Sequence, residues 1–81
     1  MIDPRYLTTE NDRRTLRDAI RMTRDIVAGK GLDMYRGPEI RPGADVRTDA
    51  ELDAFVRQTG ETIYHPVGTC RMGADPRSVV D

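Results

Sequence analysis

Two segments of the chain alternate apolar and polar residues with the period of an α-helix. In the first, apolar side chains recur every three or four residues and form one stripe on one face. Thr8 or Thr9 can supply an N-cap oxygen before this segment, and Gly29 follows its last apolar position. We therefore predict a helix over about residues 10–28. Its stripe consists of Leu16, Ala19, Ile20, Thr23, Ile26 and Val27.

The second helical segment is shorter and covers about residues 49–58. Thr48 and Glu51 have the spacing of a capping box, in which each side chain accepts a hydrogen bond from the other residue's backbone N–H. Gly60 marks the end of the segment. Its apolar face is narrow and contains Leu52, Phe55 and Val56.

The rest of the chain has no sustained periodicity. Residues 29–47 contain Gly-Pro and Pro-Gly steps and are predicted to form a loop. The residues directly before His65 are predicted to be extended, and residues 74–81 resemble a turn that leads into the start of a strand. The expected fold is therefore mainly α, with two helices, a long loop and a short extended C-terminal segment.

Composition limits the size of any core and the kinds of partner. A chain of 81 residues forms at most one small domain, and with 37% hydrophobic and 33% charged residues its core is marginal. Acidic and basic residues are interspersed, which argues against binding of nucleic acid. No apolar run approaches the roughly 20 residues of a membrane span. The N-terminus lacks a hydrophobic signal segment, so we expect a cytoplasmic location.

Arginine dominates the positive charge, with twelve Arg and one Lys against 14 acidic residues. On the first helix these arginines are expected to form the solvated face. Opposite charges four residues apart predict ion pairs along the helix, each of which contributes only about 0.2–0.5 kcal/mol. The predicted pairs are Glu10–Arg14, Arg14–Asp18 and Arg21–Asp25.

The only histidine and the only cysteine of the chain lie close together in residues 61–73, "ETIYHPVGTCRMG". Histidine is the side chain whose ordinary pKa lies near neutrality, so His65 is the natural general acid or base. The residue types alone are also compatible with further roles. His65 could be a structural histidine in a turn, and Cys70 could be a small buried packing residue or a nucleophile activated by His65. A metal site formed by His65, Cys70 and Asp75 has no recognised ligand spacing.

The run "TIYHPVGTCRMGADPRSVVD" resembles the C-terminal signature of the glucose-methanol-choline (GMC) oxidoreductases, in particular their choline dehydrogenase and alcohol dehydrogenase branch. In that signature a His-Pro-x-Gly-Thr-Cys run precedes a basic-Met-Gly step, Asp-Pro and Val-Val-Asp. The upstream runs "RYL", "PEIRPG" and "DAELDAFVRQ" are similar too. The resemblance therefore covers essentially all of residues 1–81.

This resemblance implies an α+β parent enzyme that oxidises an alcohol with FAD, and it makes residues 1–81 a segment of the C-terminal, substrate-side domain. His65 corresponds to the family's active-site base, which accepts the hydroxyl proton while hydride leaves for the flavin. Tyr64, Pro66 and Val67 would line the substrate or flavin side of the cavity. The resemblance identifies no individual cofactor-binding residue here and no metal ligand.

Two family features are missing from the sequence. The chain contains no G-x-G-x-x-G dinucleotide-binding motif and no second catalytic His or Asn after Val-Val-Asp. We therefore expect a segment that acts with the remainder of a longer enzyme on a small alcohol, and that is inactive and binds no FAD alone. The alternative is a small helical module without catalytic activity that self-associates through Leu16, Ile20 and Val27. The residues do not specify the alcohol or the electron acceptor.

Overall fold

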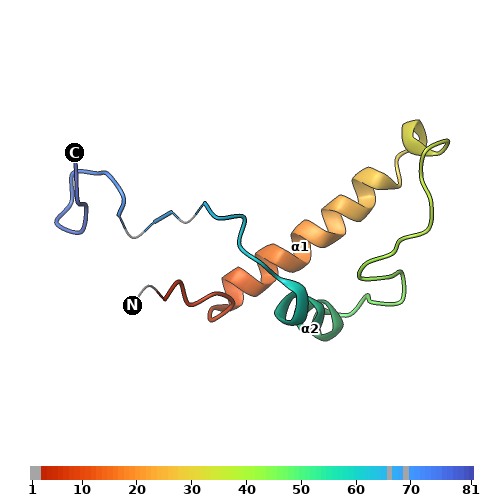
Figure 1. Cartoon of the computed structure of the whole chain (residues 1–81), viewed down its shortest axis with the longest axis horizontal. Coiled ribbons are helices and arrows are strands. Elements are labelled where there is room, and N and C mark those ends of the chain that lie inside the picture. The colour runs from red at the N-terminus through yellow and green to blue at the C-terminus, as the bar shows by residue number, and fades with distance from the viewer. Residues whose placement is uncertain (1–2, 66, 69) are drawn as a thin grey trace.

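Two α-helices and one short 3-10 turn form the regular structure. The computed structural model describes residues 3–65, 67–68 and 70–81, and these contain no strand. The mainly helical class with two helices is thus confirmed. None of the described helices is long and apolar enough to cross a bilayer. The elements are α1 (Glu10–Val27), η1 (Lys30–Leu32) and α2 (Asp49–Thr59) (Figure 1).

Side chains close both ends of α1. Thr9 is the N-cap, and its hydroxyl oxygen accepts a hydrogen bond from the backbone N–H of Asp12 at 3.1 Å. The helix ends at Val27, one residue before the predicted end, with Ala28 as its C-cap. Arg36 reaches back from the loop, and its Nη1 donates to the carbonyl oxygen of Val27 at 3.0 Å. A carbonyl that would otherwise lack a partner at the helix end is thereby satisfied.

The predicted capping box begins α2. The backbone N–H of Glu51 donates to the Thr48 hydroxyl at 3.2 Å, and the Glu51 carboxylate accepts from the N–H groups of Arg47 at 2.8 Å and Thr48 at 3.0 Å. These backbone donors hold the pKa of Glu51 below its ordinary value. At the other end Gly60 is needed for close approach, because a Cβ there would lie 2.6 Å from the carbonyl oxygen of Val56.

A buried arginine joins the two helices. Arg17 on α1 is 6% exposed, and its Nη1 donates to both carboxylate oxygens of Asp53 on α2 at 3.0 Å. Its Nη2 donates to Glu10, and its Nε lies 3.7 Å from a carboxylate oxygen of Asp49. Among the described residues, Leu52 of α2 is the one fully buried hydrophobic side chain. The contact between the helices is therefore mainly ionic.

Two more arginines of α1 bind groups distant in sequence, so the expectation of a solvated arginine face was wrong. Arg21 Nη2 donates to Asp49 at 2.6 Å. Arg24 donates to both carboxylate oxygens of Glu39, at 2.8 and 3.0 Å, and to the carbonyl oxygen of Gly43 at 3.0 Å. None of the three predicted i,i+4 pairs forms within the described part of the helix. Glu10 and Arg21 bind other charged partners, and Arg14 Nη2 donates to the side chain of Asn11 at 3.2 Å.

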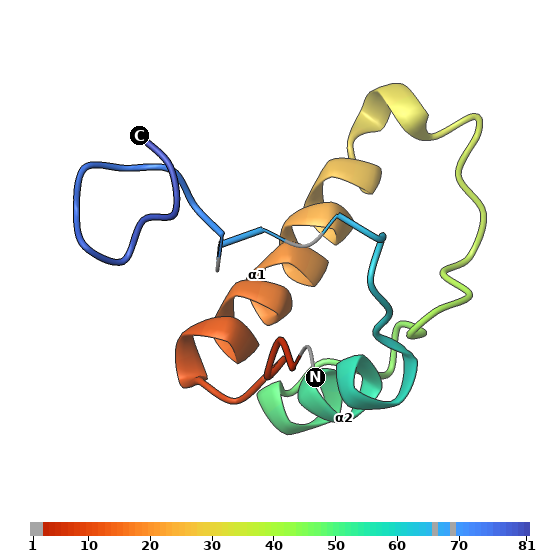
Figure 2. The same cartoon turned by 60° about the vertical axis from the view of Figure 1, so that its left-hand side comes forward.

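These contacts leave an extended molecule with an exposed apolar surface. Its radius of gyration is 17.0 Å, whereas a compact domain of this length would have about 12 Å. The C-terminal segment leaves α2 and ends in a loop away from the helices (Figures 1 and 2). The apolar stripe of α1 stays partly uncovered, with Leu16 40%, Val27 42% and Ile26 65% exposed.

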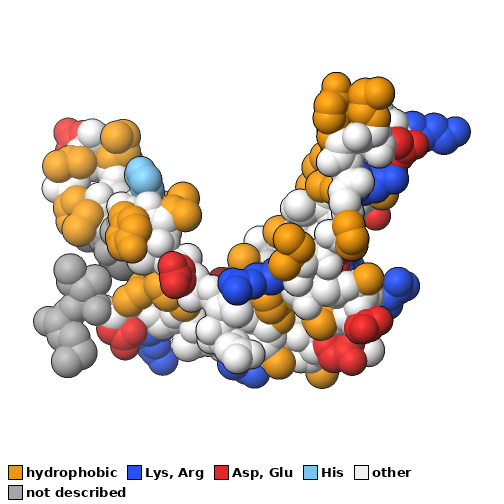
Figure 3. All heavy atoms as spheres, turned by 45° about the vertical axis from the view of Figure 1, so that its right-hand side comes forward, with side chains coloured by type: hydrophobic (Ala, Val, Ile, Leu, Met, Phe, Trp, Pro, Cys, Tyr) orange, Lys and Arg blue, Asp and Glu red, His pale blue; other side chains and the backbone are white. Residues whose placement is uncertain are grey.

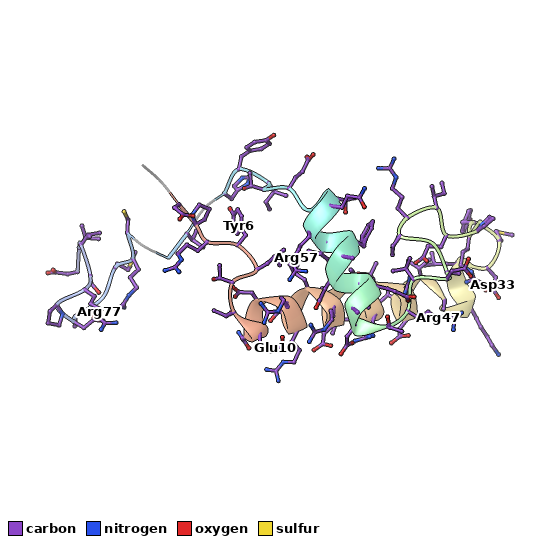
Figure 4. All side chains as sticks on the ribbon, turned by 90° about the horizontal axis from the view of Figure 1, so that it is seen from below. Tyr6, Glu10, Asp33, Arg47, Arg57 and Arg77 are labelled. Atoms are coloured by element: carbon purple, nitrogen blue, oxygen red, sulfur yellow. The ribbon has the colours of Figure 1, made fainter. Side chains whose placement is uncertain are left out.

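The C-terminal loop closes on itself. A single parallel bridge pairs Met72 with Val80, and the described residues 74–81 form a turn with this bridge but no strand. Asp75 organises the turn, since its carboxylate accepts from Arg71 Nη2 at 2.6 Å and from the backbone N–H of Arg77 at 2.8 Å. Figure 4 shows Arg77 on this loop, at the opposite end of the molecule from Asp33.

Replacing Arg17 tests whether α2 depends on its ionic contact with α1. α2 has 11 residues, fewer than the about 12–15 that an isolated helix needs to be even marginally stable in water. Arg17→Met would leave Asp53 without its partner and should unfold α2 but not the 18 residues of α1. We expect far-UV circular dichroism of the chain to lose roughly a third of its helical signal. Arg14→Met, on the same helix, is the control. Equal losses in both variants would contradict this role of Arg17.

The acidic side chains that bind Arg17 and Arg21 determine how the contact between α1 and α2 responds to pH. The Arg17 hydrogen bond holds the pKa of Glu10 below its ordinary 4.5, and the Arg21 hydrogen bond holds the pKa of Asp49 below its ordinary 3.8. Both groups bind protons less readily in the folded chain than in the unfolded chain. Their contribution to the free energy of unfolding is therefore present above the ordinary pKa values and is lost as the pH falls through the lowered pKa values. Helicity should therefore decrease between about pH 5 and pH 2. Arg17→Met should show a smaller decrease; an unchanged acid transition in this variant would count against the assignment.

Candidate active site

A tight turn after α2 carries His65. The backbone N–H of Tyr64 donates to the Thr62 hydroxyl oxygen at 3.0 Å, and Tyr64 has a φ of +66°. This left-handed conformation is uncommon for a non-glycine residue. Tyr64 thus bends the segment before His65, and the prediction of an extended conformation was wrong at this residue. The Thr62 hydroxyl captures an N–H that an extended chain would leave free.

The His65 ring is held by its own backbone. Its Nδ1 lies within hydrogen-bond distance of the carbonyl oxygen of Ile63. A carbonyl oxygen can only accept, so this contact favours the tautomer with the hydrogen on Nδ1. In a neutral imidazole the other nitrogen, Nε2, then has a free lone pair. His65 is exposed, so this lone pair belongs to an accessible side chain (Figure 3).

The glycines of the motif serve backbone geometry. Gly68 has a φ of +115°, a conformation that side chains disfavour. Gly73 lies against the C-terminal loop, where a Cβ would be 2.6 Å from the hydroxyl oxygen of Ser78. These positions let the chain turn after His65 and close the loop that follows.

The remaining predicted residues of the motif are not enclosed. Tyr64 is 83% exposed and Val67 is 94% exposed. Pro66, which the resemblance also places beside the substrate, lies outside the described residues. Val67 lines the concave surface that contains His65. The cavity wall that these residues were expected to form is therefore not closed by the described part of the chain.

A wide concave surface connects His65 with both helices (Figure 3). Its volume of about 2690 Å³ is several times the roughly 300–1,000 Å³ of a ligand pocket. The surface is therefore too large and too open to enclose one small ligand. Arginines outnumber acidic residues among its described lining residues. Its apolar part includes Leu16, Ile20, Val27, Phe55, Ile63 and Met72.

Cys70 lines the same surface and is a free, exposed thiol. The interpretation of Cys70 as a buried packing residue was wrong. No hydrogen bond joins it to His65 in the described part of the chain, so the geometry provides no activated Cys-His pair. Residues 3–65, 67–68 and 70–81 also contain no group of three or more His, Cys, Asp or Glu side chains that could hold a metal ion.

The sequence-based interpretation missed the contacts that orient His65. A Thr two residues before a turn position is a recognised local signal, because its hydroxyl can accept the N–H of the second residue after it. Thr62 and Tyr64 have that spacing. The signal was masked by Ile63 and Tyr64, which both favour strands.

Comparison with known proteins shows the relationship over the whole length. The family model described as GMC oxidoreductase matches residues 1–81. The chain is 55% identical over 76 residues to an oxygen-dependent choline dehydrogenase of Proteus mirabilis (strain HI4320). It is 58% identical to the protein of that name in Xanthomonas axonopodis pv. citri (strain 306), and 54% to the one in Pseudomonas putida (strain GB-1).

These alignments cover 94% of the chain but only 14% of each relative. The chain therefore spans about one seventh of the length of the relatives it matches. No solved structure matches it significantly. With its whole length matched by one family model, the chain belongs to the GMC oxidoreductase family.

Proposed function

We propose that this chain supplies the active-site base, His65, of an FAD-dependent enzyme that oxidises a small alcohol. The observation that carries the proposal is the state of the His65 ring, with Nδ1 bound to the Ile63 carbonyl and Nε2 free to accept a proton. Membership in the GMC family supplies the reaction class. The relatives are named choline dehydrogenases, so choline is the first alcohol to test.

The chemistry of alcohol oxidation explains why a free Nε2 matters. Conversion of an alcohol to a carbonyl removes the hydroxyl proton and a hydride from the adjacent carbon. His65 takes the proton at Nε2, and the electron pair of the O–H bond then forms the carbonyl. Proton removal by a placed base typically contributes roughly 10²–10⁴-fold to such a rate.

The backbone at the site is strained in the way that functional turns often are. Tyr64, directly before His65, has a φ of +66°, a conformation that costs free energy for a non-glycine residue. Hydrogen bonds from Tyr64 to Thr62 and from His65 to Ile63 stabilise the turn. A structural histidine would not require this geometry. The strain therefore supports a role in which the orientation of the ring matters.

The described residues do not fit FAD by themselves. A dinucleotide pyrophosphate is usually bound at a helix N-terminus that presents free N–H groups. Here Thr9 caps α1 and Thr48 caps α2, and acidic side chains occupy the first turn of both helices. Those charges repel an anion. The parent enzyme would therefore bind FAD through other parts of its chain.

The concave surface provides the place where those other parts would pack. Its exposed apolar residues include Leu16, Val27, Ile63 and Met72, although burial of such residues is favourable. The relatives have several times the length of this chain, and arginines predominate in its lining. We propose that the remainder of the parent enzyme covers this surface with apolar side chains and acidic groups. Self-association through Leu16, Ile20 and Val27 would use the same face.

The first test concerns the isolated chain, which should bind no FAD. Both helix N-termini are capped by a threonine and carry acidic side chains in the first turn, which repel a pyrophosphate. Titration of FAD with the 81-residue chain, followed by flavin fluorescence, should show no saturable binding. Saturation at one FAD per chain with micromolar affinity would contradict this part of the proposal.

The second test concerns His65 in the full-length enzyme. His65→Ala should lower the rate of alcohol-driven flavin reduction by roughly 10²-fold or more, while flavin content stays near normal. His65→Gln keeps a polar side chain of similar reach that cannot act as a base at neutral pH, so it should be slow as well. Both variants are purified, their flavin content is measured, and reduction is followed by stopped flow with choline.

Two results would contradict the role of His65. If both variants reduce flavin within about threefold of wild type, His65 is not the base. If flavin is lost and the remaining holoenzyme is normal in rate, His65 is structural. Arg14→Gln, an exposed substitution on α1, provides the control for nonspecific effects.

A further inference from the structure

We infer that Thr62 is a positioning residue for His65, and that it acts by fixing which nitrogen of the ring carries the hydrogen. This inference rests on the proposed function of His65 as a base. It adds a residue upstream of the His-Pro-x-Gly-Thr-Cys run and a physical mechanism for its role. Thr62 touches the backbone of the turn, whereas His65 is the residue that would touch substrate.

Two contacts and one backbone torsion within residues 62–65 carry the inference. The Thr62 hydroxyl oxygen accepts the N–H of Tyr64 at 3.0 Å. This bond closes the turn with Tyr64 at a φ of +66°. This turn also brings the carbonyl oxygen of Ile63 within hydrogen-bond distance of Nδ1 of His65. Without the hydrogen bond to Thr62, neither the left-handed conformation of Tyr64 nor the Ile63–His65 contact is stabilised.

The orientation of the Ile63 carbonyl decides the chemistry of the ring. While it accepts the hydrogen of Nδ1, the neutral ring has its lone pair on Nε2. If the peptide rotates, no contact of the described turn opposes the other neutral form, with hydrogen on Nε2. A ring in that form presents a donor where the alcohol hydroxyl needs an acceptor. The Thr62 hydroxyl thereby selects the form of His65 that can take a proton.

The side chain of Thr62 suits the role and permits a clean substitution series. Thr62→Val keeps the branched shape and removes the hydroxyl acceptor. Thr62→Ser keeps the acceptor and removes only the methyl group. Thr59 lies three residues earlier at the end of α2, and its hydroxyl donates to the carbonyl oxygen of Phe55 at 2.7 Å. Thr59→Val therefore deletes a comparable hydroxyl that has no contact with the turn.

The first experiment measures the ring directly. His65 is the only histidine of the chain, so the imidazole nitrogen signals of the 15N-labelled 81-residue chain belong to it alone. All the contacts lie within residues 62–65, so the turn does not depend on the docking partner. At a pH where the ring is neutral, wild type and Thr62→Ser should show the hydrogen on Nδ1. Thr62→Val should shift towards hydrogen on Nε2, and Thr59→Val should not. The same nitrogen shifts in wild type and Thr62→Val would overturn the inference.

The second experiment measures the consequence in the full-length flavin-containing enzyme. Loss of one hydrogen bond of ordinary strength should reduce the competent population, and thus kcat, by roughly five- to tenfold in Thr62→Val. KM and flavin content should change little, and Thr62→Ser should restore the rate. A merely structural role would instead lower flavin content in proportion to activity, and that outcome would refute positioning.

The two proposals can fail separately. If His65→Gln is slow but Thr62→Val has the wild-type rate, His65 remains the base and only the role of Thr62 fails. If His65→Gln retains the wild-type rate, the proposed function fails whatever Thr62 does. If Thr62→Val moves the hydrogen to Nε2 and slows the reaction, both proposals are supported.

Discussion

The buried guanidinium of Arg17 is the interaction on which the arrangement of this chain depends. A buried cation is costly unless it is paired and hydrogen-bonded. Arg17 meets this requirement because its Nη1 donates to both carboxylate oxygens of Asp53 and its Nη2 donates to Glu10, with Asp49 nearby. The contact fixes the place of α2 on α1, and thereby the point at which the chain leaves α2 towards His65. An ionic contact can do this with little apolar burial, since Leu52 is the one fully buried hydrophobic side chain among the described residues.

The same arginine chemistry holds the long loop. Arg24 binds Glu39 and Gly43, and Arg36 binds the end of α1, so residues between the helices follow α1 without a core of their own. The hydrogen bond from Arg24 holds the pKa of Glu39 below its ordinary value. Because arginine forms these bonds with a rigid planar group, it sets direction as well as charge. The apolar stripe of α1 is thereby left free for another partner.

The sequence predicted the features that depend on neighbouring residues. The apolar period, the Thr9 cap and the Thr48–Glu51 capping box act within one or two helical turns, so both helices and nearly all their bounds were predictable. The contacts of the arginines with residues distant in sequence were not predictable. A pair four residues apart contributes little, and a carboxylate across the helix contact, such as Asp53, can outcompete it. Which carboxylate an arginine binds depends on distances in the folded chain, and the periodicity of the sequence carries no information about these distances.

The candidate site likewise has features that the sequence predicted and features that it did not. The identity of His65 followed from residue type and family signature, whereas its ring orientation follows from Thr62 and the left-handed Tyr64, which strand propensity concealed. These contacts are local and form without a core. The concave surface around them is open and requires other protein to close it. The proposed base, His65, is oriented by contacts within its own turn, and Arg17 and α2 set the start of the segment that carries it. This separation explains how described residues with one fully buried hydrophobic side chain can still orient the ring of His65, the proposed base.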